Sequence, residues 1–150
     1  MADDHVFGFA TRSIHAGQPP DPETGARAMP IYATTSFVFE DAQHAADLFA
    51  LQNFGNIYTR IGNPTTAAFE ERMASLEGGL GAVATAAGQS AQLIAVLTLA
   101  REGDEVVASR SLYGGTFSQF DVTLRRMGID VTFVDFDDLD AVAAAITPAT

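Results

Sequence analysis

The second half of the chain alternates between short apolar runs and longer stretches whose apolar residues recur at helical spacing. A short apolar run is typical of a buried strand, and helical spacing indicates an amphipathic helix. The expected strands are 81–86, 105–109 and 129–135, and the expected helices are 64–77, 88–101, 116–127 and 139–146. Because strand and helix alternate three times after an opening helix, the pattern predicts an α/β fold with a mainly parallel sheet and flanking helices.

Capping residues mark both ends of the opening helix. Asn63 is an N-cap residue, and Pro64 suits the first helical position, where its missing N–H costs no hydrogen bond. Gly78 and Gly79 then favour the end of the helix. The next helix, 88–101, is apolar nearly all round, so we expect it to be buried.

The first part of the chain, 1–62, shows little sustained periodicity and carries four of the six prolines before position 31. One helix is expected there, capped by Asp41 and carrying alanines and Phe49 at helical spacing. So much irregular chain is uncommon in a compact domain. We therefore interpret 1–62 as an N-terminal arm that packs on another domain or subunit, the alternative being a surface extension without a role.

The composition fits a folded interior, since 47% of the residues are hydrophobic and 18% are charged. The net charge of −11 argues against a nucleic-acid partner, because affinity for phosphates comes from Lys and Arg. The chain has no Cys, and all eight of its basic residues are Arg. Thiolate chemistry and any mechanism that needs a side-chain amine are therefore outside this chain.

The sequence shows no sign of a membrane protein or a secreted one. The acidic start, Met1 to Asp4, is not followed by an apolar run, so we expect no signal peptide. The longest apolar stretch, 93–100, is far shorter than the roughly 20 residues that span a bilayer. We expect a cytoplasmic protein.

Three segments carry candidate chemistry, and the first is the turn between an expected strand and the helix at 88. Gly88 allows a tight turn, and the free N–H groups at a helix start attract an anion such as phosphate. The same strand–Gly–helix turn also occurs in many α/β proteins without any ligand. The turn matches neither a dinucleotide fingerprint nor a Lys-containing phosphate loop.

The other two segments each place a Tyr at a turn. Tyr113 precedes Gly114 and Gly115 after an expected strand, where its ring has room to lie over a flat ligand or to pack on the core. Tyr58 and Arg60 are two residues apart and point the same way in extended chain. A phenol and a guanidinium together can clamp a phosphate, although a solvated Arg beside a half-buried Tyr is the plainer reading.

Taken together, these segments resemble a known family, the pyridoxal-phosphate enzymes of cysteine and methionine metabolism. These are fold-type-I transferases related to cystathionine γ-synthase, and the O-acetylhomoserine sulfhydrylases (O-acetylhomoserine aminocarboxypropyltransferases) are the most similar branch. The resemblance covers the chain from about Phe7 to its end, and Gln89 stands where synthases and lyases usually carry Met. The motifs that carry it are 9–17 (FATRSIHAG), 30–37 (PIYATTSF), 58–65 (YTRIGNPT), 87–89 (AGQ) and 112–116 (LYGGT).

The resemblance implies a role for each candidate residue. Gly88 and Gln89 match the backbone donors that hold the phosphate of pyridoxal 5'-phosphate. Tyr113 matches the Tyr that stacks on the pyridine ring and is a candidate for proton transfer. Tyr58 and Arg60 match the pair that grips the phosphate in the neighbouring subunit's site, which makes the family members homo-oligomers, usually dimers of dimers. No metal is implied.

Two departures from the family's pattern stand out. Ala87 replaces the usual Ser, a small loss if backbone N–H groups carry the phosphate contact. The family's Schiff-base Lys, its pyridinium-pairing Asp and its substrate-carboxylate Arg lie past Thr150. We therefore expect 63–150 to be the truncated N-terminal part of the large cofactor-binding domain, inactive alone.

The activity implied for the full-length enzyme is γ-replacement on O-acetylhomoserine with sulfide or a thiol, giving homocysteine-type products and acetate. Sister activities are alternatives: cystathionine γ-synthase, methionine γ-lyase and O-succinylhomoserine sulfhydrylase. A more distant alternative is a non-catalytic α/β binding module with a metal at Asp135, Asp137 and Asp138. Carboxylates after a strand are more often a solvated helix start.

Overall fold

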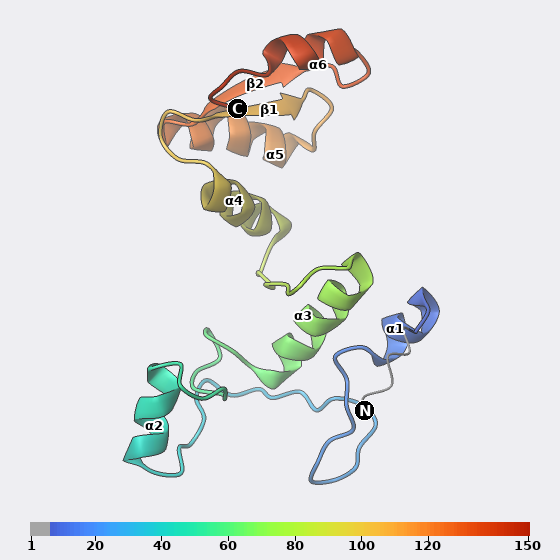
Figure 1. Ribbon diagram of the computed structural model, residues 1–150, viewed down its shortest axis with the longest axis vertical. Helices are drawn as coiled ribbons and strands as arrows, with labels where there is room; N and C mark the ends of the chain where they lie inside the picture. Colours follow the sequence, from blue (N-terminus) through green and yellow to red (C-terminus); the bar gives the residue numbers. More distant parts are fainter. Residues whose placement is uncertain (1–6) are drawn as a thin grey trace. The chain divides into compact units, whose positions relative to one another are not determined.

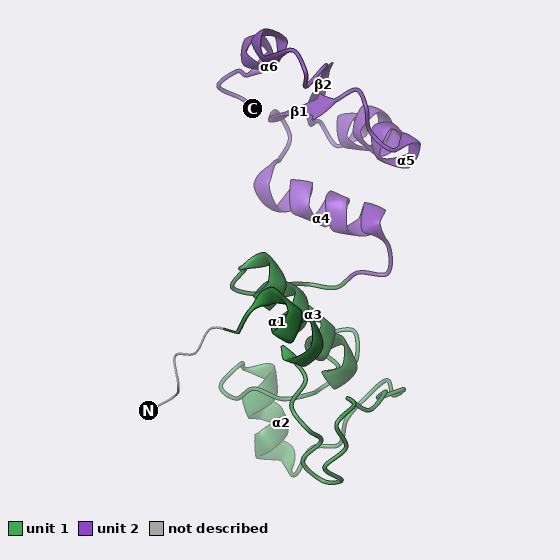
Figure 2. Ribbon diagram, turned by 90° about the vertical axis from the view of Figure 1, so that its right-hand side faces the viewer, with its two compact units in different colours: residues 1–84 green, residues 85–150 purple. Residues whose placement is uncertain are grey.

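The computed structural model describes residues 7–150 and separates the chain into two compact units, Met1–Ala84 and Thr85–Thr150 (Figures 1 and 2). The boundary between the units follows α3 (Pro64–Glu77) and precedes α4 (Gly88–Leu99). The sequence predicted a different division, between an N-terminal arm (1–62) that contacts a neighbouring subunit and the start of the cofactor-binding domain (63–150). That division stays a prediction.

Unit 1 contains three helices among the described residues: α1 (Phe9–His15), α2 (Ala42–Phe49) and α3 (Pro64–Glu77). The side chain of Asp41 caps α2 by accepting a hydrogen bond of 2.7 Å from the His44 N–H. Asn63 caps α3, and Gly78 ends it in the left-handed conformation, at φ 70°. The caps predicted for these two helices are confirmed.

The sequence pattern did not predict α1, which is held against α3 by two arginines. The Arg12 guanidinium donates to the Ser75 carbonyl, and Arg72 Nε donates to the Ala16 carbonyl at 3.0 Å. A helix of seven residues is too short for a clear period, and α1 has no buried residue. Its contacts with α3 are therefore what hold it.

Unit 2 is an α/β layer built on two parallel strands, β1 (Glu105–Ser109) and β2 (Asp130–Val134). Glu105 lies opposite Asp130, and Ser109 lies opposite Val134. The helical elements are α4 (Gly88–Leu99), α5 (Gly114–Ser118), the π-helix η1 (Gln119–Leu124) and α6 (Leu139–Ala145). Helices α5 and η1 lie on one face of the strands, and α6 lies on the other (Figure 1). The predicted parallel α/β arrangement is confirmed.

The core of unit 2 lies between the strands and the helix that joins them. Leu124 and Ile129 are 0% and 1% exposed, and Ala108 and Val131 complete the buried cluster. Partly buried side chains packed against this cluster include Leu93, Val96, Phe120 and Phe133. The core therefore fixes β1 and β2 side by side, with their carboxyl ends at the same edge.

Two sequence expectations are wrong for this chain. The run 81–86 forms no strand, because the sheet of unit 2 consists of β1 and β2 and offers this run no partner for its backbone groups. Helix α4 has no buried residue, and Leu99 on it is 89% exposed. Apolar residues on all sides of a helix predict its burial. Among the described residues, however, only one side of α4 packs on the core, through residues such as Leu93 and Val96.

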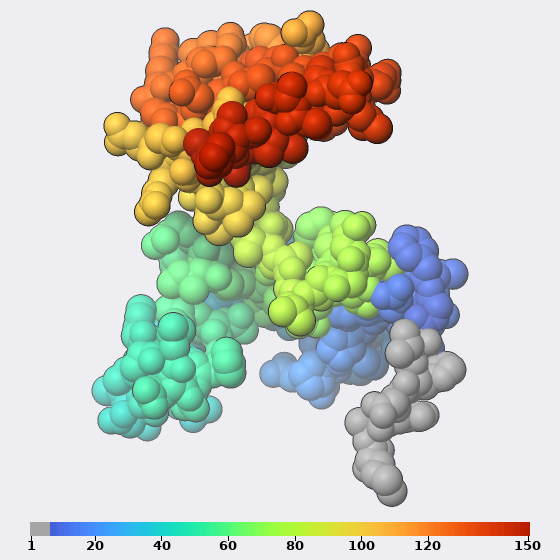
Figure 3. Space-filling model, turned by 45° about the horizontal axis from the view of Figure 1, so that its top comes forward, coloured from blue at the N-terminus to red at the C-terminus, as the bar shows by residue number. Residues whose placement is uncertain are grey.

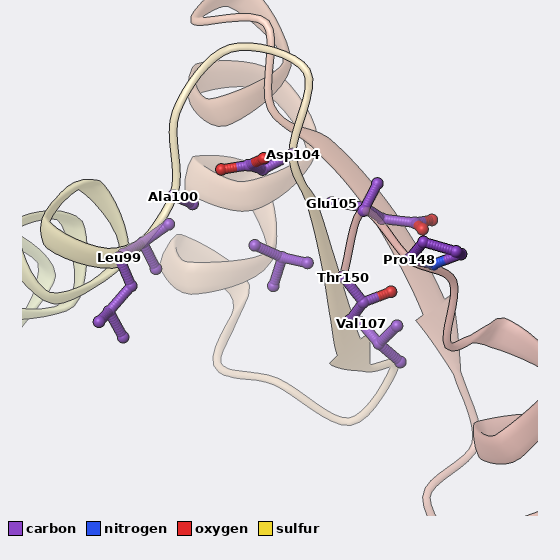
Figure 4. A pocket seen from close by; sticks show the side chains of 10 residues that line it. Leu99, Ala100, Asp104, Glu105, Val107, Pro148 and Thr150 are labelled. Atoms are coloured by element: carbon purple, nitrogen blue, oxygen red, sulfur yellow. The ribbon is translucent and has the colours of Figure 1, made fainter.

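One edge of the sheet carries the last residues of the chain. The Glu105 N–H donates to the Ala149 carbonyl at 2.8 Å, on the edge of β1 that faces away from β2. In the space-filling view the dark red C-terminal residues lie against the rest of unit 2 (Figure 3). Beside them is an open hollow of about 520 Å³, seen in Figure 4. It is lined by apolar residues that include Val96, Leu99, Val106 and Pro148.

Glu105 also joins both strands to the C-terminal segment through its side chain. Thr132 Oγ1 donates to one carboxylate oxygen at 2.5 Å, and Thr147 Oγ1 donates to the other at 3.0 Å. The hydrogen bond from Thr132, followed by that from Thr147, lowers the pKa of Glu105 below its ordinary value of 4.5. The carboxylate is therefore kept charged at this edge.

Candidate functional site

The turn that enters α4 has the features of an anion site. Ala87 is the N-cap, with extended backbone at φ −153° and ψ 147°, and no side chain caps the helix. The N–H groups of the first turn consequently lack a side-chain acceptor, and the helix dipole favours negative charge there. A Cβ on Gly88 would meet nothing within 4 Å, so the approach to this backbone is open. The residues fit a bound phosphate.

Gln89 and Tyr113, predicted separately, are brought together by Gly115. A Cβ built on Gly115 would lie 2.0 Å from Gln89 Nε2 and 2.8 Å from Tyr113 Cε1. Only a glycine leaves room for both side chains in these positions. The Tyr113 side chain is 78% exposed, so its ring is available to a ligand and does not pack on the core.

Helix α4 is connected to η1 and to α5 by two hydrogen bonds that the sequence did not reveal. Gln119 Nε2 donates to the Gln89 carbonyl at 3.0 Å. Thr116, which is 5% exposed, donates through Oγ1 to Gln92 Oε1 at 2.9 Å. A shallow hollow of about 470 Å³ lies here, lined by Gln89, Gly115, Ser118, Gln119, Val122 and Thr123. The candidate site is thus held by hydrogen bonds from α5 and η1 to α4 and by the close approach at Gly115.

Tyr58 and Arg60 lie in unit 1, at the end of the irregular segment. The Arg60 guanidinium carbon is 5.6 Å from the centroid of the Tyr58 ring, and both residues are exposed. A hollow of about 370 Å³ adjoins them, and its wall includes Phe37, Phe39 and Ile57. The pair therefore presents a phenol and a guanidinium together on the surface of unit 1, a combination suited to an anion.

The acidic residues after β2 serve local structure. Asp138 Oδ1 accepts a hydrogen bond of 3.0 Å from the Ala141 N–H and caps α6. Asp135 Oδ1 accepts one of 3.0 Å from the Asp137 N–H. Within residues 7–150 no group of three or more His, Cys, Asp or Glu side chains is placed to hold a metal ion. The helix-start interpretation of these carboxylates has direct support.

The sequence belongs to the family of Cys/Met metabolism PLP-dependent enzymes, whose model matches residues 10–150. The match takes in each of the candidate residues described above. The family resemblance inferred from the motifs is therefore confirmed.

Curated relatives narrow the likeness within the family. The chain is 52% identical over 139 residues to O-acetyl-L-homoserine sulfhydrylase 1 of Thermus thermophilus, covering 93% of this chain and 33% of the relative. It is 56% identical over 132 residues to O-acetyl-L-homoserine sulfhydrylase of Leptospira meyeri, covering 88% of this chain and 30% of the relative. The chain thus spans about a third of the length of these relatives.

Solved structures agree with the fold. A putative O-acetylhomoserine (thiol)-lyase from Campylobacter jejuni, solved with N'-pyridoxyl-lysine-5'-monophosphate, matches with a TM-score of 0.88 and 36% identity over 97% of this chain and 36% of that chain. Cystathionine gamma-lyase from Lactobacillus plantarum, complexed with L-serine, matches with a TM-score of 0.81 and 38% identity over 96% of this chain and 35% of that chain. Both support a fold-type-I front portion.

The contact at Gly115 makes a testable prediction. In the full-length enzyme, Gly115→Ala is expected to weaken binding of pyridoxal phosphate to the apoenzyme by about tenfold, roughly the loss of one aromatic stacking contact made by Tyr113. The added methyl would displace the Gln89 side chain and the Tyr113 ring, and because both residues are exposed we expect the protein to stay folded. Gly114→Ala is the matched control, because a Cβ there meets nothing within 4 Å. Equal affinities for the two variants would contradict the role given to the Gly115 contact.

Proposed function

We propose that this chain serves as the N-terminal portion of a pyridoxal-phosphate-dependent transferase that acts on O-acetylhomoserine. In the proposed γ-replacement, the bond between the γ carbon and the acetate oxygen breaks, and a C–S bond forms with sulfide or a thiol. The products are acetate and homocysteine or a homologue. The observation that carries this proposal is identity of about half over nearly the whole chain to enzymes named O-acetylhomoserine sulfhydrylase.

The residues of unit 2 have complementary roles in this proposal. The backbone N–H groups of Gly88 and Gln89 bind the cofactor phosphate at the open start of α4. The exposed ring of Tyr113 stacks on the cofactor's pyridine ring, and its hydroxyl holds a proton near the reacting atoms. Pyridoxal phosphate, when bound, supplies an electron sink for charge that develops on the substrate. The required Lys comes from the part of the enzyme outside this Lys-free chain.

Unit 1 contributes to the neighbouring subunit in the same proposal. Tyr58 and Arg60 reach the phosphate in the site of a second copy, so a homodimer is the smallest working unit. Such dimers pair into homotetramers, and the arm 1–62 supplies the contact between subunits. The small-molecule partners are an amino-acid substrate and a sulfur donor. The enzyme acts in the cytoplasm and takes part in methionine biosynthesis. Across residues 7–150, no helix has the length and apolar character that a membrane crossing needs.

The substrate test is a comparison of two esters with the full-length enzyme. We expect kcat/KM with sulfide to be at least about tenfold higher for O-acetylhomoserine than for O-succinylhomoserine, the discrimination expected from a pocket shaped for the smaller acyl group. Homocysteine is measured directly by mass spectrometry, and enzyme without added sulfide is the control. A preference for the succinyl ester, or lyase activity without a sulfur donor, would favour a sister enzyme.

A further inference from the structure

Asn63 is more than the cap of α3. It is 4% exposed, and its side chain makes three hydrogen bonds to three different parts of unit 1. Its Oδ1 accepts from the Thr65 N–H at 2.9 Å, which is the cap. Its Nδ2 donates to the Tyr32 carbonyl at 2.9 Å and to Thr59 Oγ1 at 3.1 Å. One buried amide therefore joins the start of α3, the extended segment around Tyr32, and the residue between Tyr58 and Arg60.

The segment that Asn63 holds is the tight turn 58–62, which carries Tyr58 and Arg60. The Tyr58 carbonyl accepts from the Ile61 N–H at 2.8 Å and from the Gly62 N–H at 3.0 Å, so Arg60 lies within the turn. The beginning of the turn is fixed because Tyr58 forms an isolated antiparallel bridge with Ser36.

Thr59, in the middle of this turn, is bonded on both sides. Its N–H donates to the Thr35 carbonyl at 2.8 Å, and its hydroxyl donates to the Thr34 carbonyl. The same hydroxyl oxygen accepts from Asn63 Nδ2. Because the Thr59 hydroxyl is already used as a donor, the Asn63 amide is the group that completes its hydrogen bonds.

We infer that Asn63 is a positioning residue, which acts through Arg60 by holding the 58–62 turn in the conformation that presents the guanidinium to the cofactor phosphate. This inference rests on the proposed function. The donors of the buried amide set the geometry of the turn, while its acceptor sets the start of α3. The two halves of one side chain therefore have separable effects.

Two substitutions separate these effects. Asn63→Ser retains a hydroxyl that caps a helix well but is too short to replace the two donated hydrogen bonds. Asn63→Ala removes both the donors and the cap. If the donors position Arg60, both variants weaken binding of pyridoxal phosphate to the full-length apoenzyme by about tenfold, as expected for the loss of a buried hydrogen bond. Both variants should lower Tm through the lost buried hydrogen bonds, and Asn63→Ala should lower it further through the missing cap.

A double-mutant cycle with Arg60→Ala distinguishes positioning from general destabilisation. If Asn63 acts through Arg60, Asn63→Ser has no further effect on cofactor affinity in an Arg60→Ala enzyme, so the two losses are not additive. Additive losses would overturn the inference while leaving the role of Arg60 intact. An Arg60→Ala enzyme with unchanged affinity would instead overturn the proposed role of Arg60.

A second readout does not depend on the cofactor at all. Amide hydrogen exchange of Ile61 and Gly62, whose N–H groups bond to the Tyr58 carbonyl, reports whether the turn is formed. Asn63→Ser is expected to accelerate both exchange rates about tenfold and to leave amides within α3 unchanged. Unchanged exchange at Ile61 and Gly62 would overturn the inference whatever the affinities show.

Discussion

Full-length enzyme with Arg60→Ala is expected to bind pyridoxal phosphate about a hundredfold more weakly than the wild type. The guanidinium supplies charge-assisted hydrogen bonds to a doubly charged phosphate, which are stronger than neutral ones. The guanidinium carbon of Arg60 lies 5.6 Å from the centroid of the Tyr58 ring, on the exposed 58–62 turn. The loss is measured by titrating the apoenzyme with cofactor and following the change in absorbance.

Arg126→Ala is the matched control for the change in charge. Arg126 is an exposed residue beyond η1 that does not line the hollow beside Gln89 and Gly115, and its loss should leave the dissociation constant within about twofold of the wild type, as for most surface substitutions. Equal effects of the two substitutions would mean that overall charge, and not the 58–62 turn, accounts for the change.

The polypeptide 1–150 by itself is expected to form no homocysteine and to develop no yellow absorbance of a lysine-bound cofactor. It contains no Lys, so its sole primary amine is the terminal one on Met1, which lies outside the described residues. Phosphate recognition at Gly88 and Gln89 can survive in part, because it uses the backbone. Borohydride reduction followed by mass spectrometry locates any bound cofactor, and an adduct elsewhere than Met1 would contradict this account.

The same polypeptide should also self-associate. Apart from the Glu105 N–H, which bonds to the Ala149 carbonyl, the edge of β1 that faces away from β2 has no partner strand among the described residues, and such an edge is a template for another chain. Exposed apolar side chains such as Leu80 and Leu99, at 111% and 89% exposure, add to this tendency. Analytical ultracentrifugation at increasing concentration measures the effect, and a monomer throughout would contradict it.

Local signals in the sequence predicted much of this structure because they act over a few residues. Asp41, Asn63 and Asp138 each cap the helix expected after them, since an N-cap needs only its own side chain and the next N–H groups. The strand at 105–109 has the predicted bounds, because β2 pairs with it and the core cluster covers its buried face.

Features that depend on distant residues were not predictable in the same way. The run 81–86 has the composition of a strand but pairs with no strand, and α4 has the composition of a buried helix but is covered only in part, through residues such as Leu93 and Val96. The second role of Asn63 requires knowledge of where Tyr32 and Thr59 lie. The closeness of Gly115 to Gln89 likewise arises from the packing of two helix starts.

The most direct test of a shared site is the activity of a defined heterodimer of full-length subunits. One subunit carries Arg60→Ala, and the other lacks the Schiff-base Lys but retains Arg60. If Arg60 serves the neighbour's site, one site combines an intact Lys with an intact Arg60, and the heterodimer has about half of the wild-type activity while both homodimers have little. If each subunit uses its own Arg60, no site is complete, and a verified heterodimer without recovered activity would contradict the account.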